Sequence, residues 1–337
     1  MKSRALLVLA LTLAVFTLVV APGDLSAQQK WKAVATSRPT PQFALWTWLG
    51  DELDKRTKGQ VKLEVVSLPE LGLTGFELVR VTRAGLVDVS DIILTYVAGD
   101  VPMIEGVDLP GLFPSLDVSI KAHVGFMPAI KKVEDKLGGV VLGGYMWPGQ
   151  YLFTKKPVKG PEDLKGLKVR VYGTAQTELA RALGMEAVSI PFAEVYTALE
   201  RGTVDAGITG TYPGFALKWY EVTKYLVDIG HGPVGGAFVM SKRTWDRLTP
   251  ETKAIVTKLG EEFSEKGWEI GRRTTQEGID ENKKKGMELI GISPAMAAAT
   301  QKATKEIIIP SWLKRAGPDG KAVFNQYLAP HAGYTLP

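Results

Sequence analysis

The sequence predicts an α/β protein with two lobes, each a mostly parallel sheet flanked by helices. Short β-branched runs alternate with stretches of helical periodicity, which is the pattern of parallel strands joined by helical crossovers. A helix, a glycine, Val-Asp and a strand follow one another around residues 85–88 and again around residues 202–205, so two similar units are expected. A run of helix formers at 250–285 would extend about 50 Å, which is longer than one lobe.

The first unit is expected to contain three strands and two helices. Phe43, Trp46 and Leu49 recur at helical spacing, and Gly59 can take the left-handed conformation that closes a helix. The expected order is strand 32–35, helix 43–58, strand 61–65, helix 75–83 and strand 87–94. Prolines in residues 102–114 indicate irregular loops after this unit.

The second unit repeats this order before the long helix. The expected elements are strand 168–172, helix 175–183, strand 187–190 and helix 192–201, then strand 288–292 and helices 294–307 and 322–328. The long helix contains Gly260, Gly267 and Gly271. Glycine weakens helix interiors, so a break is expected at one of these positions.

Residues 1–27 have the features of a secretory signal peptide. Lys2 and Arg4 form a short basic region, residues 5–20 are apolar with threonine as the one polar type, and residues 25–27 offer a small-residue cleavage site. The apolar run is shorter than the roughly 20 residues that span a bilayer. We therefore expect export to the periplasm through a cleavable leader, with an uncleaved N-terminal anchor as the alternative.

Composition excludes several classes of function. The chain has no cysteine, which excludes disulfides, zinc-thiolate sites and thiol catalysis. The 41 basic and 36 acidic residues are interspersed, so no nucleic-acid partner is expected. His123, His231 and His331 are scattered singly, and no metal or cofactor is expected. Residues 230–235 match Gly-x-Gly-x-x-Gly, but Pro233 removes a backbone donor and a strand-like segment follows, where a dinucleotide site needs a helix.

Arg170 occupies an unusual position for a charged residue. It lies on the opposite face of the expected strand 168–172 from Val169 and Val171, close to the carboxyl end of that strand. Ligands of α/β sheets bind beyond the carboxyl ends of strands, and a guanidinium there suits a carboxylate, which it grips through two parallel hydrogen bonds. A structural ion pair with a neighbouring acidic residue is the equally weighted alternative.

Several ordered segments carry a resemblance to a known family. The sequence resembles the solute-binding proteins of TRAP transporters, of the DctP type. The segments that carry it are PEDLKGLKVR at 161–170, ALG at 182–184, IPFAEVYTAL at 190–199 and GTVD at 202–205, with LG at 71–72, DLP at 108–110, YEVTKYL at 220–226 and VMSK at 239–242 in support. These segments span most of the chain that follows the expected leader.

The resemblance implies a periplasmic-binding-protein-like fold that closes around an organic acid by hinge motion and passes it to a sodium-coupled permease with small and large membrane subunits. It implies that Arg170 holds the ligand carboxylate and that the long helix spans both lobes. We expect lobe I to comprise residues 28–147 and 237–276, and lobe II residues 148–236 and 277–337. The protein is expected to be a monomer or a weak dimer, and not an enzyme.

The sequence departs from the family at positions that affect the ligand. Many members carry a second arginine shortly before the segment that corresponds to Phe153-Thr154, where this chain has no cation. One carboxylate clamp among aromatic side chains predicts a monocarboxylate with an apolar or aromatic body, such as a 2-oxo acid or an aromatic acid. The further candidate contacts are Trp147, Gln150, Tyr151, Phe192, Thr209, Tyr212 and Glu77.

Two other functions remain open at this point. An exported small-acid enzyme on the same fold would need a positioned base near Arg170, for which Glu194 and Asp205 are the titratable candidates in sequence. A sensor that hands its ligand to a membrane kinase is not separable from a transport receptor by sequence. Recovery of an unchanged ligand from the protein would favour the receptor over the enzyme.

Overall fold

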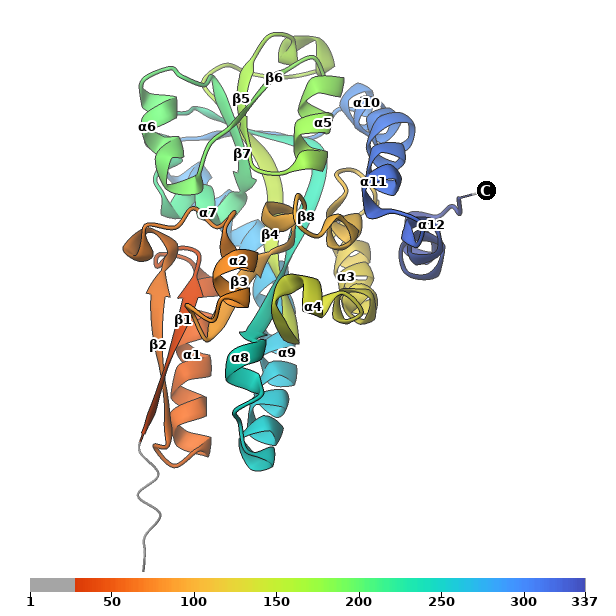
Figure 1. The fold of residues 1–337 in the computed structure, drawn as a ribbon. Helices are drawn as coiled ribbons and strands as arrows, with labels where there is room; N and C mark the ends of the chain where they lie inside the picture. Colours follow the sequence, from red (N-terminus) through yellow and green to blue (C-terminus); the bar gives the residue numbers. More distant parts are fainter. Residues whose placement is uncertain (1–27, 337) are drawn as a thin grey trace, which may run out of the picture.

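The computed structural model describes residues 28–336, and the expected leader at 1–27 lies outside them. The strands of the described part form one mixed sheet in the order β2-β1-β3-β8-β4-β7-β5-β6, with β9 paired to β8 (Figure 1). The strands are β1 (Gln29–Ala35), β2 (Val61–Ser67), β3 (Val89–Ile93), β4 (Gly139–Thr154), β5 (Lys168–Val171), β6 (Glu186–Ser189), β7 (Ala206–Gly210), β8 (Tyr225–Ser241) and β9 (Glu288–Ile290).

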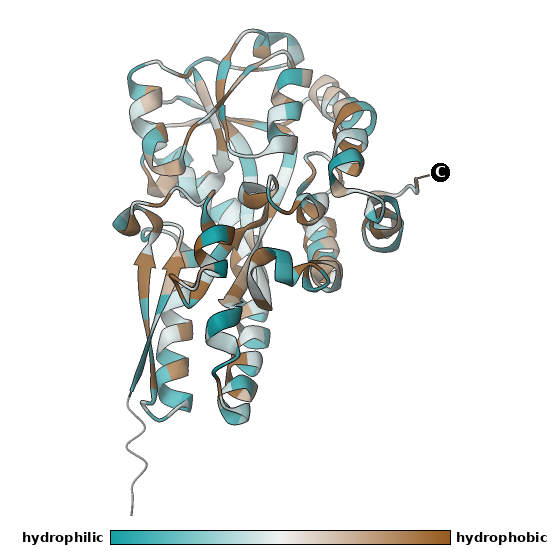
Figure 2. Cartoon of the chain, in the orientation of Figure 1, coloured by the Kyte–Doolittle hydropathy of each residue, from teal (hydrophilic) through white to brown (hydrophobic). Residues whose placement is uncertain are grey.

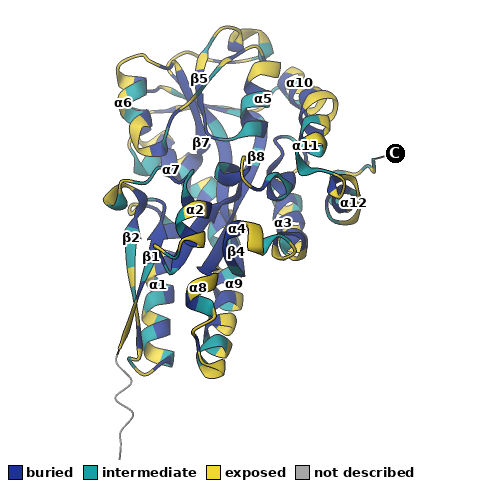
Figure 3. Cartoon of the chain, in the orientation of Figure 1, coloured by how far each residue is buried: buried dark blue, intermediate teal, exposed yellow. Residues whose placement is uncertain are grey.

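Helices cover the sheet and fill the C-terminal region. They are α1 (Pro41–Arg56), α2 (Leu78–Arg83), α3 (Leu116–Lys131), α4 (Glu134–Leu137), α5 (Thr174–Ala182), α6 (Val195–Glu200), α7 (Thr211–Ala216), α8 (Lys242–Trp245), α9 (Pro250–Lys284), α10 (Pro294–Ala303), α11 (Ile309–Ala316), α12 (Gly320–Val323) and α13 (Ala329–Ala332). Figure 3 shows the strands largely buried and the exposed residues concentrated on the helices and loops. Within residues 28–336, no helix is both long and apolar enough to cross a membrane.

The predicted two-lobed α/β class is confirmed, with one difference in how the lobes are joined. In Figure 1, β1, β2 and β3 lie in the lower part of the molecule and β5, β6 and β7 in the upper part. Strands within each group pair in parallel, whereas β4 and β8 pair antiparallel with each other and pass through both parts. The two expected sheets are therefore one continuous sheet, because these two long strands connect them.

The long strands β4 and β8 are buried along most of their length. Fourteen of the 16 residues of β4 and most residues of β8 are buried, which requires protein on both faces of the strands. Figure 2 shows brown, hydrophobic stretches along the strands and teal, hydrophilic residues on the outer helices. The sequence of a strand buried on both faces is apolar without alternation, so a period-two pattern does not mark the strand.

Helix α9 is unbroken, so the expected interruption at one of its glycines is wrong. Added Cβ atoms would lie 2.3 Å from the Leu142 carbonyl oxygen at Gly260 and 2.4 Å from Tyr145 Cβ at Gly267. At Gly271 the nearest atom would be Met146 Cβ, at 2.6 Å. These glycines let the helix backbone approach β4 closely, and packing against the sheet outweighs their low helix propensity.

Most other expected elements are present within a few residues of their predicted bounds. Helix α3 was not predicted, although Ser115 caps its start by accepting a hydrogen bond from the Val118 amide. The segment expected at 322–328 is a short α-helix, α12, followed by a π-helical turn. The lobe boundaries stay a prediction, and the C-terminal helices also pack against α3, which falls in the expected lobe I.

Candidate functional site

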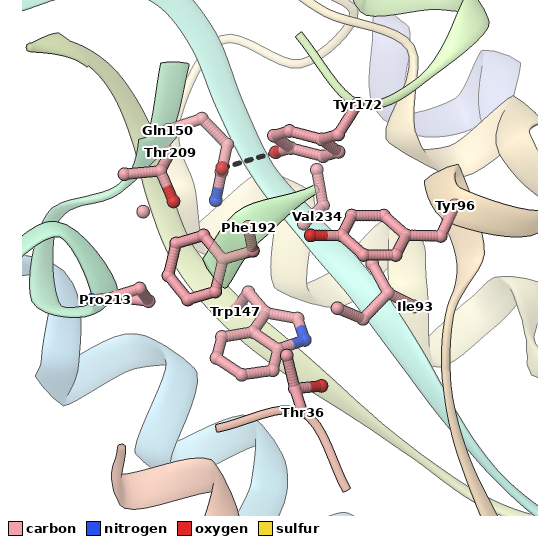
Figure 4. Close-up of a pocket in the computed structure, with 11 residues that line it drawn as sticks. Thr36, Ile93, Tyr96, Trp147, Gln150, Tyr172, Phe192, Thr209, Pro213 and Val234 are labelled. Atoms are coloured by element: carbon pink, nitrogen blue, oxygen red, sulfur yellow. Dashed lines mark hydrogen bonds between the residues drawn. The ribbon is translucent and has the colours of Figure 1, made fainter. Parts of the chain in front are cut away.

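A small cavity lies where the carboxyl ends of strands from both lobes meet. Its volume is about 30 Å³, enough for a water molecule or two, so entry of an organic acid requires the walls to move apart. The lining is mostly aromatic and aliphatic (Figure 4). The lining residues are Thr36, Ile93, Tyr96, Trp147, Gln150, Tyr172, Phe192, Thr209, Gly210, Pro213 and Val234.

Arg170 on β5 lies behind the aromatic side chains of this cavity and is 0% exposed. Its Nε donates to the Ile190 carbonyl oxygen at 2.9 Å and Nη1 to the Ile208 carbonyl oxygen at 2.9 Å. The guanidinium carbon lies 4.6 Å from the centroid of the Tyr172 ring and 5.7 Å from that of Phe192. Both rings line the cavity. Cation–π contacts with these rings therefore keep the guanidinium close to the edge of the cavity.

The guanidinium has no acidic partner in the described part of the chain. Besides the two carbonyl groups, its one hydrogen-bond partner there is the Tyr96 hydroxyl, 3.5 Å from Nη2. A guanidinium has five N–H donors, and these bonds use three of them. A buried, unneutralised cation with free donors is the arrangement that an incoming carboxylate satisfies.

Gln150 and Tyr172 form a fixed polar pair on one side of the cavity. The Tyr172 hydroxyl donates to Gln150 Oε1 at 2.5 Å (Figure 4), and Gln150 Nε2 donates to the Pro148 carbonyl oxygen at 2.6 Å. The backbone register of β4 against β8 shifts on both sides of Gln150, which turns this amide into the cavity. One N–H of Gln150 is left to meet a ligand.

Thr36 and Trp147 form the lobe I side of the cavity and share a buried hydrogen-bond network. Trp147 Nε1 donates to the Tyr145 hydroxyl at 2.9 Å, and that hydroxyl donates to Asp91 Oδ1. Thr36 donates to Asp91 Oδ2 from its backbone N at 3.0 Å and from Oγ1 at 2.8 Å. The indole therefore presents its apolar face to the cavity, because its one donor is used.

The structure brings together some of the expected contact residues and separates others. Trp147, Gln150, Phe192 and Thr209 line the same cavity, and Arg170 stands directly behind it. The other three expected contacts, Tyr151, Tyr212 and Glu77, do not line it.

Each of these three residues has another environment. Tyr151 lies beside Asp228 on the neighbouring strand β8, and burial together with that carboxyl raises its pKa. Tyr212 packs edge-on against Phe215 on α7, with 5.7 Å between ring centroids. The Glu77 carboxylate accepts hydrogen bonds from Thr74 and Gly75 in its own turn, so its oxygens are occupied away from the cavity.

Sequence reasoning identified Trp147 but missed the other cavity residues of lobe I. Thr36 follows β1 and Tyr96 follows β3, so the rule that placed a ligand at strand ends would have found both if applied to the first unit. Tyr172 lies two residues after Arg170 and points to the same side. Val234 on the long strand β8 had no such signal, because that strand was not predicted at full length.

A wider groove lies next to the cavity. It has a volume of about 380 Å³ and shares Thr36 and Phe192 with the inner cavity. One wall comes from the loop after β2, including Leu73 and Thr74, and the other from Pro191 to Glu194. The groove thus lies between segments of both lobes.

His123 and His231 are buried and hydrogen-bonded to neighbouring groups of the fold. His123 is buried, and its Nε2 lies 2.7 Å from Asp108 Oδ1 while Nδ1 lies 2.7 Å from the Ser119 carbonyl oxygen. Burial lowers the pKa of His231 to about 4, and its ring bonds Gln176. Within residues 28–336, no cluster of three or more His, Asp or Glu side chains is arranged to hold a metal ion.

A two-lobed α/β chain with a small cavity at the strand ends and a buried cation beside it has the architecture of a solute-binding protein. Residues 33–314 match the family described as bacterial extracellular solute-binding protein, family 7, or DctP. Because the match spans most of the chain, the protein belongs to this family, and the resemblance to TRAP solute-binding proteins is confirmed.

Individual relatives agree with this membership. The 2,3-diketo-L-gulonate-binding periplasmic protein YiaO of Escherichia coli is 29% identical over 270 residues, which cover 79% of this chain and 82% of YiaO. DctP7 of Bordetella pertussis, an extracytoplasmic solute receptor binding pyroglutamic acid, superposes with a TM-score of 0.84 at 26% identity and covers 89% of this chain and 99% of its own.

A more distant structure supports the fold alone. A TRAP periplasmic solute-binding protein of Desulfovibrio salexigens, solved with bound orotic acid, has a TM-score of 0.84 at 22% identity. The match covers 91% of this chain and 99% of that protein.

Proposed function

We propose that this protein captures a small monocarboxylate with an apolar or aromatic body between its lobes in the periplasm and delivers it to a two-subunit, sodium-coupled TRAP permease. The observation that carries the proposal is Arg170, fully buried beside the cavity and without an acidic partner in the described residues. A bound carboxylate supplies the missing negative charge.

The walls of the cavity support the proposed body of the ligand. Trp147, Phe192, Ile93 and Val234 supply apolar surface. In the described part of the chain, Arg170 is the one cation that stacks on aromatic rings of the lining. Pyroglutamic acid, which the Bordetella pertussis receptor binds, is a compact ring with a single carboxylate. Closure follows from ligand contacts on both lobes, because such contacts form together only in the closed state.

The experiment begins with mass spectrometry of small molecules released from the purified protein, followed by a thermal-shift panel of organic acids. A ligand that binds only the folded state raises the melting temperature in proportion to the logarithm of its concentration over Kd. We expect an unchanged monocarboxylate in the released fraction, and stabilisation by 2-oxo or aromatic monoacids. Stabilisation by succinate or malate but by no monoacid would overturn the proposed ligand class, and a chemically altered product would favour an enzyme.

A further inference from the structure

Asp91 on β3 is a buried carboxylate immediately behind the lobe I side of the cavity. It is 1% exposed and accepts hydrogen bonds from Thr36 and from the Tyr145 hydroxyl. No basic side chain of residues 28–336 forms an ion pair with it. Aspartate is almost never fully buried without a cationic partner, because the uncompensated charge is costly in an apolar interior.

Asp91 reaches the cavity through two of the residues that line it. Thr36 bonds the Asp91 carboxylate directly, and Trp147 bonds it through the Tyr145 hydroxyl. Figure 4 shows Thr36 and Trp147 next to each other at the same end of the cavity. The negative charge is therefore separated from a bound ligand by a single layer of side chains.

The ionised state of Asp91 holds at neutral pH. Burial raises its pKa to about 6, while the hydrogen bonds from Tyr145 and Thr36 act in the opposite direction. The Thr36 amide and the hydroxyl groups of Thr36 and Tyr145 all donate to this carboxyl group, which is the arrangement of an ionised carboxylate. Charges in a protein interior are screened far less than charges at the surface.

Arg170 and Asp91 place opposite charges on the two sides of one cavity. Arg170 comes from β5 in lobe II and contacts Tyr172 and Phe192, whereas Asp91 comes from β3 in lobe I. Neither charge is neutralised by an ion pair within the described chain. The resulting field favours a ligand with its carboxylate toward Arg170 and a neutral end toward Thr36 and Trp147.

We propose, on the basis of the function proposed above, that Asp91 is a specificity-determining residue that excludes acids with a second carboxylate. A dicarboxylate bound to Arg170 would direct its other anion toward Asp91, where the described lining offers no cation to offset the repulsion. Unfavourable charge juxtaposition is a general means of rejecting the wrong partner. Asp91 acts through Thr36 and Trp147 and does not itself line the cavity.

Three 2-oxo acids with the same five-carbon skeleton test this proposal. 2-Oxopentanoate, the N,N-dimethyl-5-amide of 2-oxoglutarate and 2-oxoglutarate end in a methyl group, a neutral amide and a carboxylate. In isothermal titration calorimetry at pH 7.5, the wild-type protein is expected to bind the amide at least tenfold more tightly than 2-oxoglutarate. Asp91→Asn keeps the shape of the side chain and removes its charge, and is expected to reduce that ratio at least fivefold.

Asp88→Asn is the matched control. Asp88 precedes β3 at the end away from the cavity, where it accepts hydrogen bonds from the Lys32 amide and Thr244 Oγ1. This variant changes the net charge by the same amount in the same lobe. The amide-to-carboxylate ratio should remain at the wild-type value.

Three outcomes would overturn the proposal. The first is wild-type affinities for the amide and 2-oxoglutarate within threefold of each other, a result that stands even if Asp91→Asn does not fold. The second is an equal loss for all three acids in Asp91→Asn, which indicates a purely structural role. The third applies if the wild-type protein binds 2-oxopentanoate but neither of the other two acids. Asp91→Asn must then gain binding of 2-oxoglutarate, and no gain would overturn the proposal.

Failure of the proposed function gives a different result. If no acid in the thermal-shift panel binds, the function and the inference both fall. If another monoacid binds but these three do not, that monoacid and its counterparts with terminal amide and terminal carboxylate replace them, with the same criteria.

Discussion

Tyr96 and Arg170 meet across the gap between the lobes. The Tyr96 hydroxyl lies 3.5 Å from Arg170 Nη2, and the Tyr96 ring lies 5.2 Å from the ring of Tyr172. Tyr96 follows β3 in one lobe and Arg170 belongs to β5 in the other. The proposed opening of the cleft would separate these two side chains and break the contact, which would link the expected ligand-binding cation to closure.

Replacement of Tyr96 by phenylalanine is expected to weaken both binding and closure. The variant keeps the ring contacts with Phe76 and Tyr172 but removes the hydroxyl that accepts from Arg170. A hydrogen bond to a charged group contributes about 1.5–3 kcal/mol at normal length, and this one is long at 3.5 Å, so affinity should fall about threefold to tenfold. Calorimetry measures the affinity, and small-angle X-ray scattering should show a less compact ligand-bound state. Tyr220→Phe, in lobe II away from the cavity lining, should leave both unchanged.

Arg170→Lys is expected to abolish high-affinity binding although it keeps the positive charge. A lysine ammonium cannot bond two carbonyl groups and grip a carboxylate through a planar fork at the same time. We expect at least a hundredfold loss of affinity for the best acid of the panel, measured by calorimetry. Arg181→Lys, on the exposed side of α5 in the same lobe, should bind like the wild-type protein. Retained binding in Arg170→Lys would contradict the proposed role.

Gly267→Ala is expected to destabilise the fold by about 3 kcal/mol. The new methyl group would lie 2.4 Å from Tyr145 Cβ, and such overpacking costs more than the roughly 1 kcal/mol that alanine gains in a helix. Gly99→Ala, where an added Cβ meets no atom within 4 Å, should change the melting temperature little. Equal melting temperatures for both variants in thermal denaturation would contradict close packing of α9 on β4.

Asp91 is expected to give the protein a distinctive dependence of stability on pH. Its folded-state pKa is about 6, above the ordinary 3.8, so between these values the native state binds more protons than the unfolded chain. The contribution of Asp91 to stability is therefore smallest above pH 6 and increases as pH falls toward 4. A shift of this size corresponds to roughly 3 kcal/mol.

The measurement compares wild type with Asp91→Asn in urea denaturation at pH 7.5, 6, 5 and 4. The difference in free energy of unfolding between the two proteins should move in favour of the wild type as pH falls, while other titrating groups, such as His231, cancel. A difference that is constant over this range would show that Asp91 does not titrate as its burial indicates.

Sequence patterns were sufficient for the elements whose signal is local. The helix that became α1 and the strand that became β2 were visible because spacing and alternation mark one buried face each. The long strands β4 and β8 were missed because burial on both faces removes alternation. The three glycines of α9 were taken as helix breakers, and only their distances to β4 show that they are contact points.

The site was predictable where a residue's environment follows from its own strand. Arg170 stood out because a charged residue near the end of a buried strand must find a partner. Tyr151 and Gln150 could not be told apart, because the register shifts in β4 that turn Gln150 into the cavity have no sequence mark. Asp91 was overlooked because its link to the cavity runs through Tyr145, more than 50 positions away in sequence.

The uninterrupted course of α9 restricts how this receptor can open. α9 runs beside both lobes without a break. It can bend or slide as a unit, but it has no interruption at which one lobe could rotate against the other. The compliant points lie instead in the strands, at the irregular pairing beside Gln150 and at Gly230 and Gly232, which have left-handed backbones. Separation of the lobes would therefore take place at these points of the strands, while α9 stays packed along β4.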